Sequence, residues 1–288
     1  MKSKSPSKNN DKVVVAKVTG GLGNQLFIYA AAKRLSVMND VPLKLDTSSA
    51  YTKDGYNRSY SLNHFRLNAE YASGEDVYTL DLGSRRNLRY QINKILPFRY
   101  KCFIRENKLF DPRLLTLKIA DKVYLDGYWQ DENYFKDIET TIRKDFEIIS
   151  PHDHINIQLA KEMYETNAIC LHARRLKYEY LLPTEYYDLA IKHIIKKVPS
   201  PHFYCFSDDM EWIKNNITID SPVTYVSHNK ESKDYEDLWL MTQCKHYIIA
   251  NSTFSWWGAW LNPDASKMII SPKNWGYRAA VPEDWIVL

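Results

Sequence analysis

The chain has 288 residues, of which 44% are apolar and 26% are charged, as is usual for a soluble globular protein. This length suffices for two domains of about 140 residues each. The net charge of +4 is too small to indicate a nucleic-acid-binding protein, and the four cysteines are widely spaced, with no Cys/His cluster typical of zinc.

The first half of the chain opens with a polar tail and a β-α-β unit. Residues 1–11 lack the apolar core of a signal peptide, and we expect them to be a disordered tail. Residues 13–18 form an apolar run typical of a buried strand, residues 20–25 read GGLGNQ, and residues 26–37 show helical spacing. A second predicted strand ends at Asp46. This order predicts a parallel sheet covered by helices.

The middle of the chain contains longer loops. Residues 50–75 are polar and rich in tyrosine, and residues 85–105 are basic and aromatic. The latter favour a solvated helix face, with contact to anionic lipid head groups as the alternative. A strand and an aromatic loop are predicted over 122–135. A polar, proline-containing stretch follows, so we expect an N-terminal α/β domain over 12–150 and a C-terminal one over 151–288.

In the second half, predicted strands and helices alternate as in a doubly wound Rossmann-like domain. Three predicted strands, at 168–172, 202–207 and 246–250, each run into a polar cluster. Ligands of such sheets bind beyond the carboxyl ends of the strands. The clusters are His172-Ala173-Arg174-Arg175, Ser207-Asp208-Asp209 and Asn251-Ser252-Thr253-Phe254-Ser255. We therefore expect one ligand crevice at this edge.

These residue types suit a nucleoside diphosphate. A guanidinium pairs with phosphate oxygens in bidentate fashion, and a helix N-terminus offers backbone N–H groups at a positive dipole end. We predict a diphosphate between Arg174 and the helix start at 252–255. Asp208 or Asp209 is suited to accept hydrogen bonds from the N1–H and amino group of guanine. The structural alternatives are an Arg–Asp pair that joins two loops, and ordinary helix capping.

We expect no metal and no cofactor. Metal-dependent sugar transferases usually carry an Asp-x-Asp motif, which this sequence lacks. Arginine and a helix N-terminus can neutralise a diphosphate without a cation.

Several motifs together resemble bacterial α-1,2-fucosyltransferases of glycosyltransferase family 11. They are GGLGNQLF at 20–27, the His-x-Arg-Arg and Ser-Asp-Asp clusters, and CKHYIIANSTFSWWGAWLN at 244–262. The similarity covers most of residues 12–276, and the last block is long and specific, whereas GGLGNQ alone is weak. The resemblance implies a GT-B-like α/β architecture, with two Rossmann-like domains facing across a cleft. The C-terminal domain would hold GDP-β-L-fucose, and the N-terminal domain would help to bind the acceptor.

The resemblance also implies an inverting, metal-independent transfer of fucose to a glycan hydroxyl, commonly the 2-OH of a terminal galactose. Arg174 would stabilise the leaving β-phosphate. The donor-binding residues would be His172, Arg174, Arg175, Asp208, Asp209, Ser252, Thr253, Phe254 and Ser255. On the acceptor side we expect Gly21, Gly23, Asn24, Gln25 and Trp129, with a plain strand-to-helix turn as the alternative for the glycine stretch.

One position departs from the family pattern. The family usually reads His-x-Arg-Arg-Gly-Asp-Tyr, whereas this chain has Lys177 where the aspartate is expected. Glu179 is our candidate for the general base that partly replaces it, with Glu185 as a weaker alternative. The departure could also indicate a different acceptor, a different donor or weak activity.

Three other functions remain open. The first is transfer from a related GDP-sugar such as GDP-L-galactose, and the second is a catalytically silent nucleotide-sugar-binding protein. The third is an NAD(P)-dependent oxidoreductase, since a glycine-rich turn is followed by Asp46 near the place of a ribose-binding acid. However, Leu26 stands where that fingerprint needs Gly or Ala.

We expect a bacterial cytoplasmic enzyme of surface polysaccharide synthesis, without nucleic-acid partners. The acceptor could be lipid-linked, with residues 85–105 in peripheral contact with the inner membrane leaflet. No run of apolar residues is long enough to span a bilayer.

Overall fold

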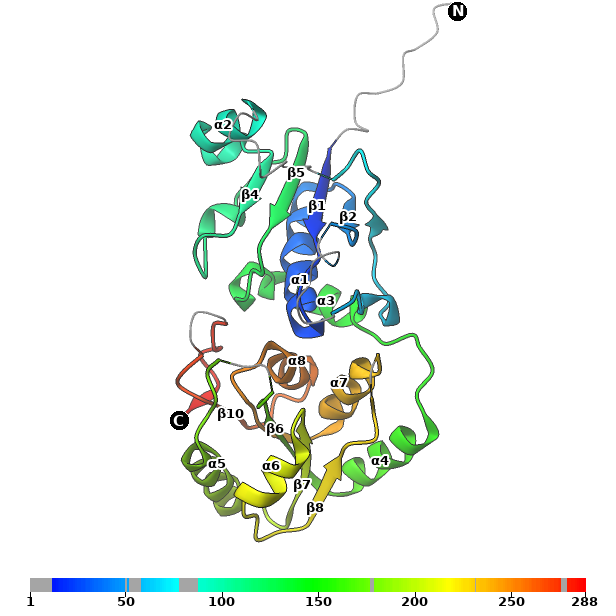
Figure 1. Cartoon of the computed structure of the whole chain (residues 1–288), viewed down its shortest axis with the longest axis vertical. Coiled ribbons are helices and arrows are strands. Elements are labelled where there is room, and N and C mark those ends of the chain that lie inside the picture. The colour runs from blue at the N-terminus through cyan, green and yellow to red at the C-terminus, as the bar shows by residue number, and fades with distance from the viewer. Residues whose placement is uncertain are drawn as a thin grey trace, which may run out of the picture. The chain divides into compact units, whose positions relative to one another are not determined.

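The computed structural model describes residues 12–49, 51, 58–77, 88–176, 179–230, 232–275 and 279–288, with side chains of the helix that begins at 88 described from 91 on. The expected tail at 1–11 and the departure at Lys177 lie outside these residues. The chain divides into two compact units, Met1–Phe146 and Glu147–Leu288. Each consists of a parallel β-sheet with helices packed on it (Figure 1).

The sheet of the first unit has the strand order β3-β2-β1-β5-β4, and its strands pair in parallel. The central strand β1 is buried, as its run of valines predicts. The strands are β1 (Val13–Lys17), β2 (Leu43–Asp46), β3 (Glu70–Tyr71), β4 (Phe103–Arg105) and β5 (Lys122–Asp126). The helices are α1 (Leu22–Asn39), α2 (Leu88–Ile95) and α3 (Glu139–Asp145).

Helix α1 begins within the glycine-rich stretch, four residues before the predicted start at Leu26. Gly21 is the N-cap residue, and only Gly20 has the left-handed φ, of 80°, that favours glycine. Gly23, Asn24 and Gln25 are therefore helical residues instead of turn residues. Almost every side chain of α1 up to Ser36 is buried, so this part of the helix has no solvent-facing side.

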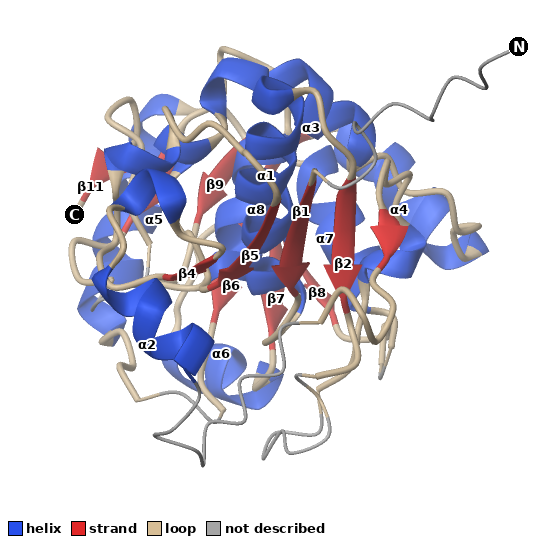
Figure 2. Cartoon of the chain, turned by 90° about the horizontal axis from the view of Figure 1, so that it is seen from above, coloured by secondary structure: helices blue, strands red, loops and turns tan. Residues whose placement is uncertain are grey.

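The sheet of the second unit has the order β11-β10-β9-β6-β7-β8, and its strands also pair in parallel. The strands are β6 (Asn167–Ala173), β7 (Pro201–Ser207), β8 (Val223–Val226), β9 (His246–Ile248), β10 (Ile269–Ser271) and β11 (Ile286–Val287). The helices are α4 (His154–Glu165), α5 (Thr184–Lys197), α6 (Met210–Asn216), α7 (Asp234–Gln243) and α8 (Thr253–Leu261). Figure 2 shows the sheet strands in red and the helices in blue.

Helices cover both faces of this second sheet. The apolar faces of α5 and α6 form one core with Ile169, Leu171 and Phe203 of the strands. On the other side, α7 packs against α4 and α8. The unit is thus a doubly wound α/β domain, and the predicted fold class of two Rossmann-like units is confirmed. Strands β8 and β11 were missed, because β8 has only one buried residue and β11 has two residues in all.

The thiols differ in exposure. Cys170, Cys205 and Cys244 are buried, whereas Cys102 is partly exposed. Burial raises the pKa of the Cys170 and Cys205 thiols above its usual range. No helix in the described part of the chain is both long and apolar enough to cross a membrane.

Helix α8 has three buried tryptophans, and a glycine lies where it meets α7. Trp256 stacks on Trp260 at a ring distance of 6.0 Å and contacts Trp257 edge-on at 4.9 Å. A Cβ atom placed on Gly258 would lie 2.8 Å from the Cβ of Met241 in α7. Glycine is therefore needed at 258 for the close approach of α7 and α8.

We predict that Gly258→Ala destabilises the protein, although alanine favours a helix by about 1 kcal/mol over glycine. The added methyl group meets an atom fixed to the backbone of α7, and such overpacking costs about 1–3 kcal/mol. Thermal unfolding should show a lower Tm. Gly74→Ala is the control, since a Cβ there meets no described atom within 4 Å. An unchanged or higher Tm for Gly258→Ala would contradict the prediction.

Candidate active site

The strand order of the second unit brings the three predicted polar clusters to one edge of the sheet. Strand β6 lies between β9 and β7. In register, Ala173 pairs with Ser207 of β7, and Leu171 pairs with Ile248 of β9. Because all three strands are parallel, the segments that follow them emerge side by side.

The two neighbouring arginines have different surroundings. The Arg175 guanidinium lies 3.7 Å from the ring centroid of Trp212, and its Nη1 donates to the backbone oxygen of Leu182 at 2.8 Å. The Arg174 side chain is 35% exposed, and its Nη1 lies 3.2 Å from Oδ2 of Asp208. Arg174 thus offers an accessible guanidinium at the sheet edge, whereas Arg175 holds α6 and the following loop together.

The two aspartates after β7 make structural contacts. Oδ1 of Asp208 accepts a hydrogen bond from the backbone N–H of Arg175 at 2.8 Å, and Oδ2 accepts one from that of Leu176 at 3.0 Å. Oδ1 of Asp209 accepts from the backbone N–H of Trp212 and caps α6. These contacts agree with the structural alternatives of loop pairing and capping. A guanine contact by either residue stays a prediction.

Helix α8 is apolar and largely buried, but its N-terminal end carries polar groups. Ser252 is the N-cap residue, and its side chain makes no capping bond within the described residues. The first N–H groups of an α-helix have no partner inside the helix. The Ser255 hydroxyl donates back to the Ser252 oxygen at 3.3 Å. The helix start therefore offers backbone donors at the same edge of the sheet as Arg174.

His172 lies deep at the same edge. Its side chain is 4% exposed, and its ring centroid is 6.0 Å from that of Phe254. Burial, together with the charge of Arg174, lowers the pKa of His172 to about 3. Its Nδ1 has no hydrogen-bond partner within the described part of the chain. The imidazole is therefore neutral at neutral pH and carries one N–H donor.

Glu179 is an exposed residue of the loop between β6 and α5. Its neighbour Tyr180 accepts a hydrogen bond through its backbone oxygen from Nδ2 of Asn251, at 2.9 Å. This bond ties the loop to the segment that leads into α8. Glu185, the weaker candidate for the base, lies in the first turn of α5.

In the first unit, the predicted acceptor-side residues Asn24 and Gln25 bind protein groups. Gln25 is buried, and its Nε2 donates to the backbone oxygens of Gly20 and Ser59 at 2.9 and 2.8 Å. Oδ1 of Asn24 accepts from Nε2 of Gln130 at 2.9 Å. Gln25 thus fixes the glycine turn to the loop at Ser59, while Asn24 joins the turn to the loop after β5.

Trp129 offers no ring face in this structure. It is 2% exposed and packs edge-on against Tyr134 at 5.6 Å, with a left-handed φ of 55°. The preceding Tyr128 is 38% exposed. Any aromatic contact of this loop with a ligand would therefore involve Tyr128, while the role of Trp129 in acceptor binding stays a prediction.

Glu106, whose role was not predicted from the sequence, anchors this loop. Its two carboxylate oxygens accept the backbone N–H groups of Tyr128 and Trp129 at 2.6 and 2.9 Å. Burial raises the pKa of its carboxyl group. A Cβ on Gly127 would lie 2.3 Å from the Cβ of Glu106, so the glycine permits the contact. Gly127 before two aromatic residues was the only signal in the sequence.

Asp46 has its carboxylate fully engaged. It is buried and accepts hydrogen bonds from the hydroxyl groups of Ser48, Ser49 and Tyr124. The residue is therefore a structural support of β2 and does not face a ribose.

A second missed cluster lies at the start of α7, after β8. Burial raises the pKa of Asp234 to about 6 and that of Asp237 to about 7. Oδ1 of Asp237 accepts from Nδ2 of Asn229 at 2.8 Å, and the charges of Asp234 and Glu236 raise its pKa further. Residues 234–237 read DYED, so the acidic residues were visible in the sequence, but their burial was not.

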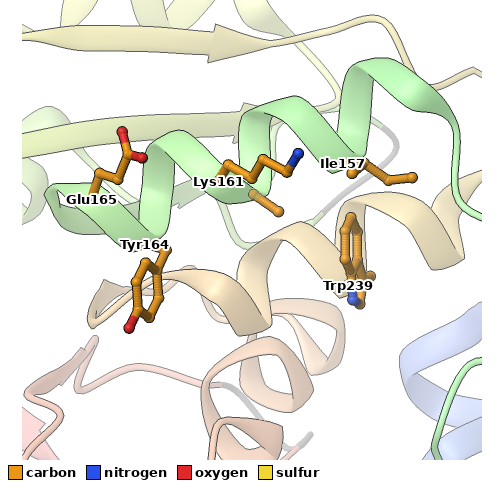
Figure 3. A pocket seen from close by; sticks show the side chains of 6 residues that line it. Ile157, Lys161, Tyr164, Glu165 and Trp239 are labelled. Atoms are coloured by element: carbon orange, nitrogen blue, oxygen red, sulfur yellow. The ribbon is translucent and has the colours of Figure 1, made fainter.

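A shallow hollow of about 330 Å³ lies on α4 and α7 (Figure 3). It is lined by Ile157, Ala160, Lys161, Tyr164, Glu165 and Trp239. None of the predicted site residues contributes to it. Among the described residues, no group of three or more His, Cys, Asp or Glu side chains is placed to hold a metal ion.

We predict that Asp237→Asn raises stability more at high pH than at low pH. In the folded protein the Asp237 carboxyl keeps its proton up to about pH 7, whereas in the unfolded chain it loses it near 3.8. The wild-type protein therefore loses stability as pH rises through this window. The Asp237→Asn variant does not, because its amide does not titrate. The Tm difference between variant and wild type should be larger by a few degrees at pH 8 than at pH 4.5. The exposed Asp220→Asn is the control, and a pH-independent difference would contradict the prediction.

Comparison with known proteins gives the family. The family model described as "Glycosyl transferase family 11" matches residues 13–283. The chain is 33% identical to an α-1,2-colitosyltransferase of Escherichia coli, over 95% of this chain and 98% of that protein. It is 31% identical to the O-antigen biosynthesis glycosyltransferase WbnK of Escherichia coli, over 90% and 93% of the two chains.

Among solved structures, the fold is similar to that of the NodZ α-1,6-fucosyltransferase soaked with GDP-fucose. The TM-score is 0.52 with 14% identity, over 88% of this chain and 93% of that one. This likeness concerns the GT-B-like fold alone. The family model covers nearly the whole chain, which sets aside the oxidoreductase alternative. The chain belongs to glycosyltransferase family 11 and is a glycosyltransferase.

Proposed function

We propose that the protein transfers L-fucose from GDP-β-L-fucose to a glycan hydroxyl with inversion, and that this hydroxyl is the 2-OH of a terminal galactose. The observation that carries the proposal is the neighbourhood of Arg174 and the α8 N-terminus at one edge of the second sheet. The motif resemblance to bacterial α-1,2-fucosyltransferases supports the donor. The E. coli relative named as an α-1,2-transferase supports the linkage.

In this proposal the diphosphate lies between Arg174 and the first turn of α8. The guanidinium and the backbone N–H groups stabilise the charge that grows on the β-phosphate as its bond to C1 of the sugar breaks. Both are held in place before the donor binds, so little reorganisation is needed during the reaction. His172, as a neutral ring, would donate one hydrogen bond to the donor. Because two sets of donors meet the diphosphate, we propose that no metal is required.

Inversion requires a single displacement. The oxygen of the acceptor hydroxyl bonds to C1 while the C1–O bond to the β-phosphate breaks, and GDP departs on the opposite face. The hydroxyl proton must go to a base, and we assign that role to Glu179. The hydrogen bond from Asn251 to the backbone oxygen of Tyr180, the next residue, ties this loop to the α8 start and supports the assignment.

One observation favours a GDP-sugar other than GDP-fucose as the donor. The relative that is 33% identical over 95% of this chain is named a colitosyltransferase. Colitose is L-fucose without the 3-hydroxyl group. A pocket built to bind a hydroxyl group rejects the deoxy analogue by about 10⁴-fold or more, whereas a pocket for the deoxy sugar discriminates far less. The ratio of kcat/KM for the two GDP-sugars therefore separates the donors.

The acceptor proposed here is a galactoside of a surface polysaccharide. The O-antigen biosynthesis relative supports this class. A lipid-linked form of the acceptor and peripheral contact with the inner membrane leaflet remain part of the proposal. The basic stretch at 85–105 would make that contact. It contains Arg85 and Arg86, which lie outside the described residues, as does the side chain of Arg89.

We predict that Arg174→Ala lowers kcat/KM for GDP-fucose about 10²–10³-fold, as the loss of an oxyanion-type contact does. Arg174→Lys should recover only part of the rate, because an ammonium group lacks the bidentate fork. Transfer to a galactoside is measured by release of GDP, and the linkage and anomer of the product by NMR. Lys214→Ala, at an exposed position of α6, is the control. Full activity of Arg174→Ala would refute the phosphate assignment, and a loss of activity in EDTA would refute metal independence.

We predict that Glu179→Ala lowers kcat about 10²–10⁴-fold while changing the affinity for GDP little, as expected for loss of a general base. Glu179→Gln should behave alike, since it keeps the shape but not the proton acceptor. The pH profile of kcat should lose its acidic limb in both variants. Turnover near the wild-type value in either variant would remove Glu179 as the base, and Glu185→Gln is the next variant to measure.

A further inference from the structure

We infer that Asp208 acts as a positioning residue that holds Arg174 and the backbone after β6 in the geometry needed for transfer, and does not read the guanine base. The inference rests on the proposed function, because it concerns the arginine assigned there to the diphosphate. It follows from the contacts of one carboxylate with three consecutive residues.

Asp208 binds the whole segment that leaves β6. Its Oδ1 accepts from the Arg175 N–H at 2.8 Å, and its Oδ2 accepts from the Leu176 N–H at 3.0 Å. Oδ2 also lies 3.2 Å from Nη1 of Arg174. Bonds to an ionised carboxylate are stronger than those between neutral groups. Asp208 therefore fixes both the backbone of this segment and the guanidinium direction of Arg174.

The carboxylate is itself held from the other side. Ser207 and Ala173 pair in register across β7 and β6, so Asp208 follows the strand next to Arg174. Its neighbour Asp209 donates its N–H to the Ser207 hydroxyl and caps α6. With the strand before it and the helix cap after it, the backbone at Asp208 is fixed. A rigid anchor of this kind can orient a flexible arginine.

The same contacts leave too few acceptor positions for guanine. A carboxylate has about four lone-pair sites. Two of them accept the N–H groups of Arg175 and Leu176, the charged guanidinium of Arg174 lies 3.2 Å from Oδ2, and the side chain is only 18% exposed. Guanine presents N1–H and its amino group side by side and needs two free acceptor sites in one plane. The geometry therefore favours the contact to the arginine.

The arrangement also explains why the two arginines take separate roles. Arg175 lies over Trp212 and binds the backbone oxygen of Leu182, so its guanidinium is held by protein groups. Arg174 has its side chain 35% exposed, and an exposed ion pair contributes little to stability. The contact of Arg174 with Asp208 therefore matters through the direction it gives the guanidinium, not through the free energy of unfolding.

The test compares Asp208→Asn with the wild-type protein, alone and combined with Arg174→Ala. Calorimetry gives the affinities for GDP and for inosine diphosphate, which lacks the 2-amino group of guanine. The value of kcat/KM is measured separately with the GDP-sugar donor. In asparagine, an NH₂ group replaces one carboxylate oxygen and faces the N–H groups that this oxygen bound. We expect kcat/KM to fall at least 10-fold and GDP affinity at least fivefold, with an unchanged ratio of GDP to inosine diphosphate affinity.

In the Arg174→Ala background the same substitution should change both quantities by a smaller factor, because the part of its effect that passes through the Arg174 guanidinium is already lost. A GDP-to-inosine-diphosphate ratio that collapses towards one in Asp208→Asn would overturn the inference. Equal fold-losses in the two backgrounds would do so as well. Asp220→Asn, in an exposed turn, is the matched control, and unfolding curves identify any variant that fails to fold.

The outcome is separable from that of the proposed function. If the wild-type protein transfers neither fucose nor colitose, the proposed function fails. The calorimetric comparison still tests whether Asp208 acts through Arg174 on the diphosphate. Asp208→Glu provides the second variant, because it keeps the charge and lengthens the side chain. It should retain GDP affinity better than Asp208→Asn if an ionised anchor is what Arg174 requires.

Discussion

The parallel hydrogen-bonded ladder of β6 with its two neighbours is the constraint on which the donor site depends. Strand β6 carries His172 and leads to Arg174, β7 leads to Asp208, and β9 leads to the start of α8. These segments are distant in the sequence, and only the side-by-side pairing of three parallel strands brings their ends together. A slip of one residue in either pairing would move Asp208 or the α8 start away from Arg174.

The polar edge is supported by an apolar framework. Helix α8 is buried over Ser255–Trp260 and contains three tryptophans there. Gly258 permits its close approach to Met241 of α7. A helix held so firmly presents its N-terminal donors in a fixed direction. On the other side, the stacking of Arg175 on Trp212 holds the loop after β6 against α6. Donor binding therefore relies on contacts that never touch the donor.

The sequence allowed the fold class, the strand ends and the order of the motifs to be predicted, because apolar runs and strand-to-helix turns are local features. It did not reveal the partners of individual side chains. Gln25 is polar and yet fully buried, since backbone oxygens of Gly20 and Ser59 satisfy it. Trp129 turns inward and Tyr128 outward because Glu106, the residue after β4, binds their N–H groups. Such long-range contacts leave no periodic trace.

The distribution of the cysteines has a practical consequence. Three of the four thiols are shielded inside the second unit, and only Cys102, in the first unit, is partly exposed. Thiolate character and access govern the reactivity of cysteine. A maleimide dye added to the native enzyme would therefore mark a single position, and no thiol would have to be removed by mutation beforehand. The natural sequence thus provides a ready attachment point for following the first unit by fluorescence while substrates bind.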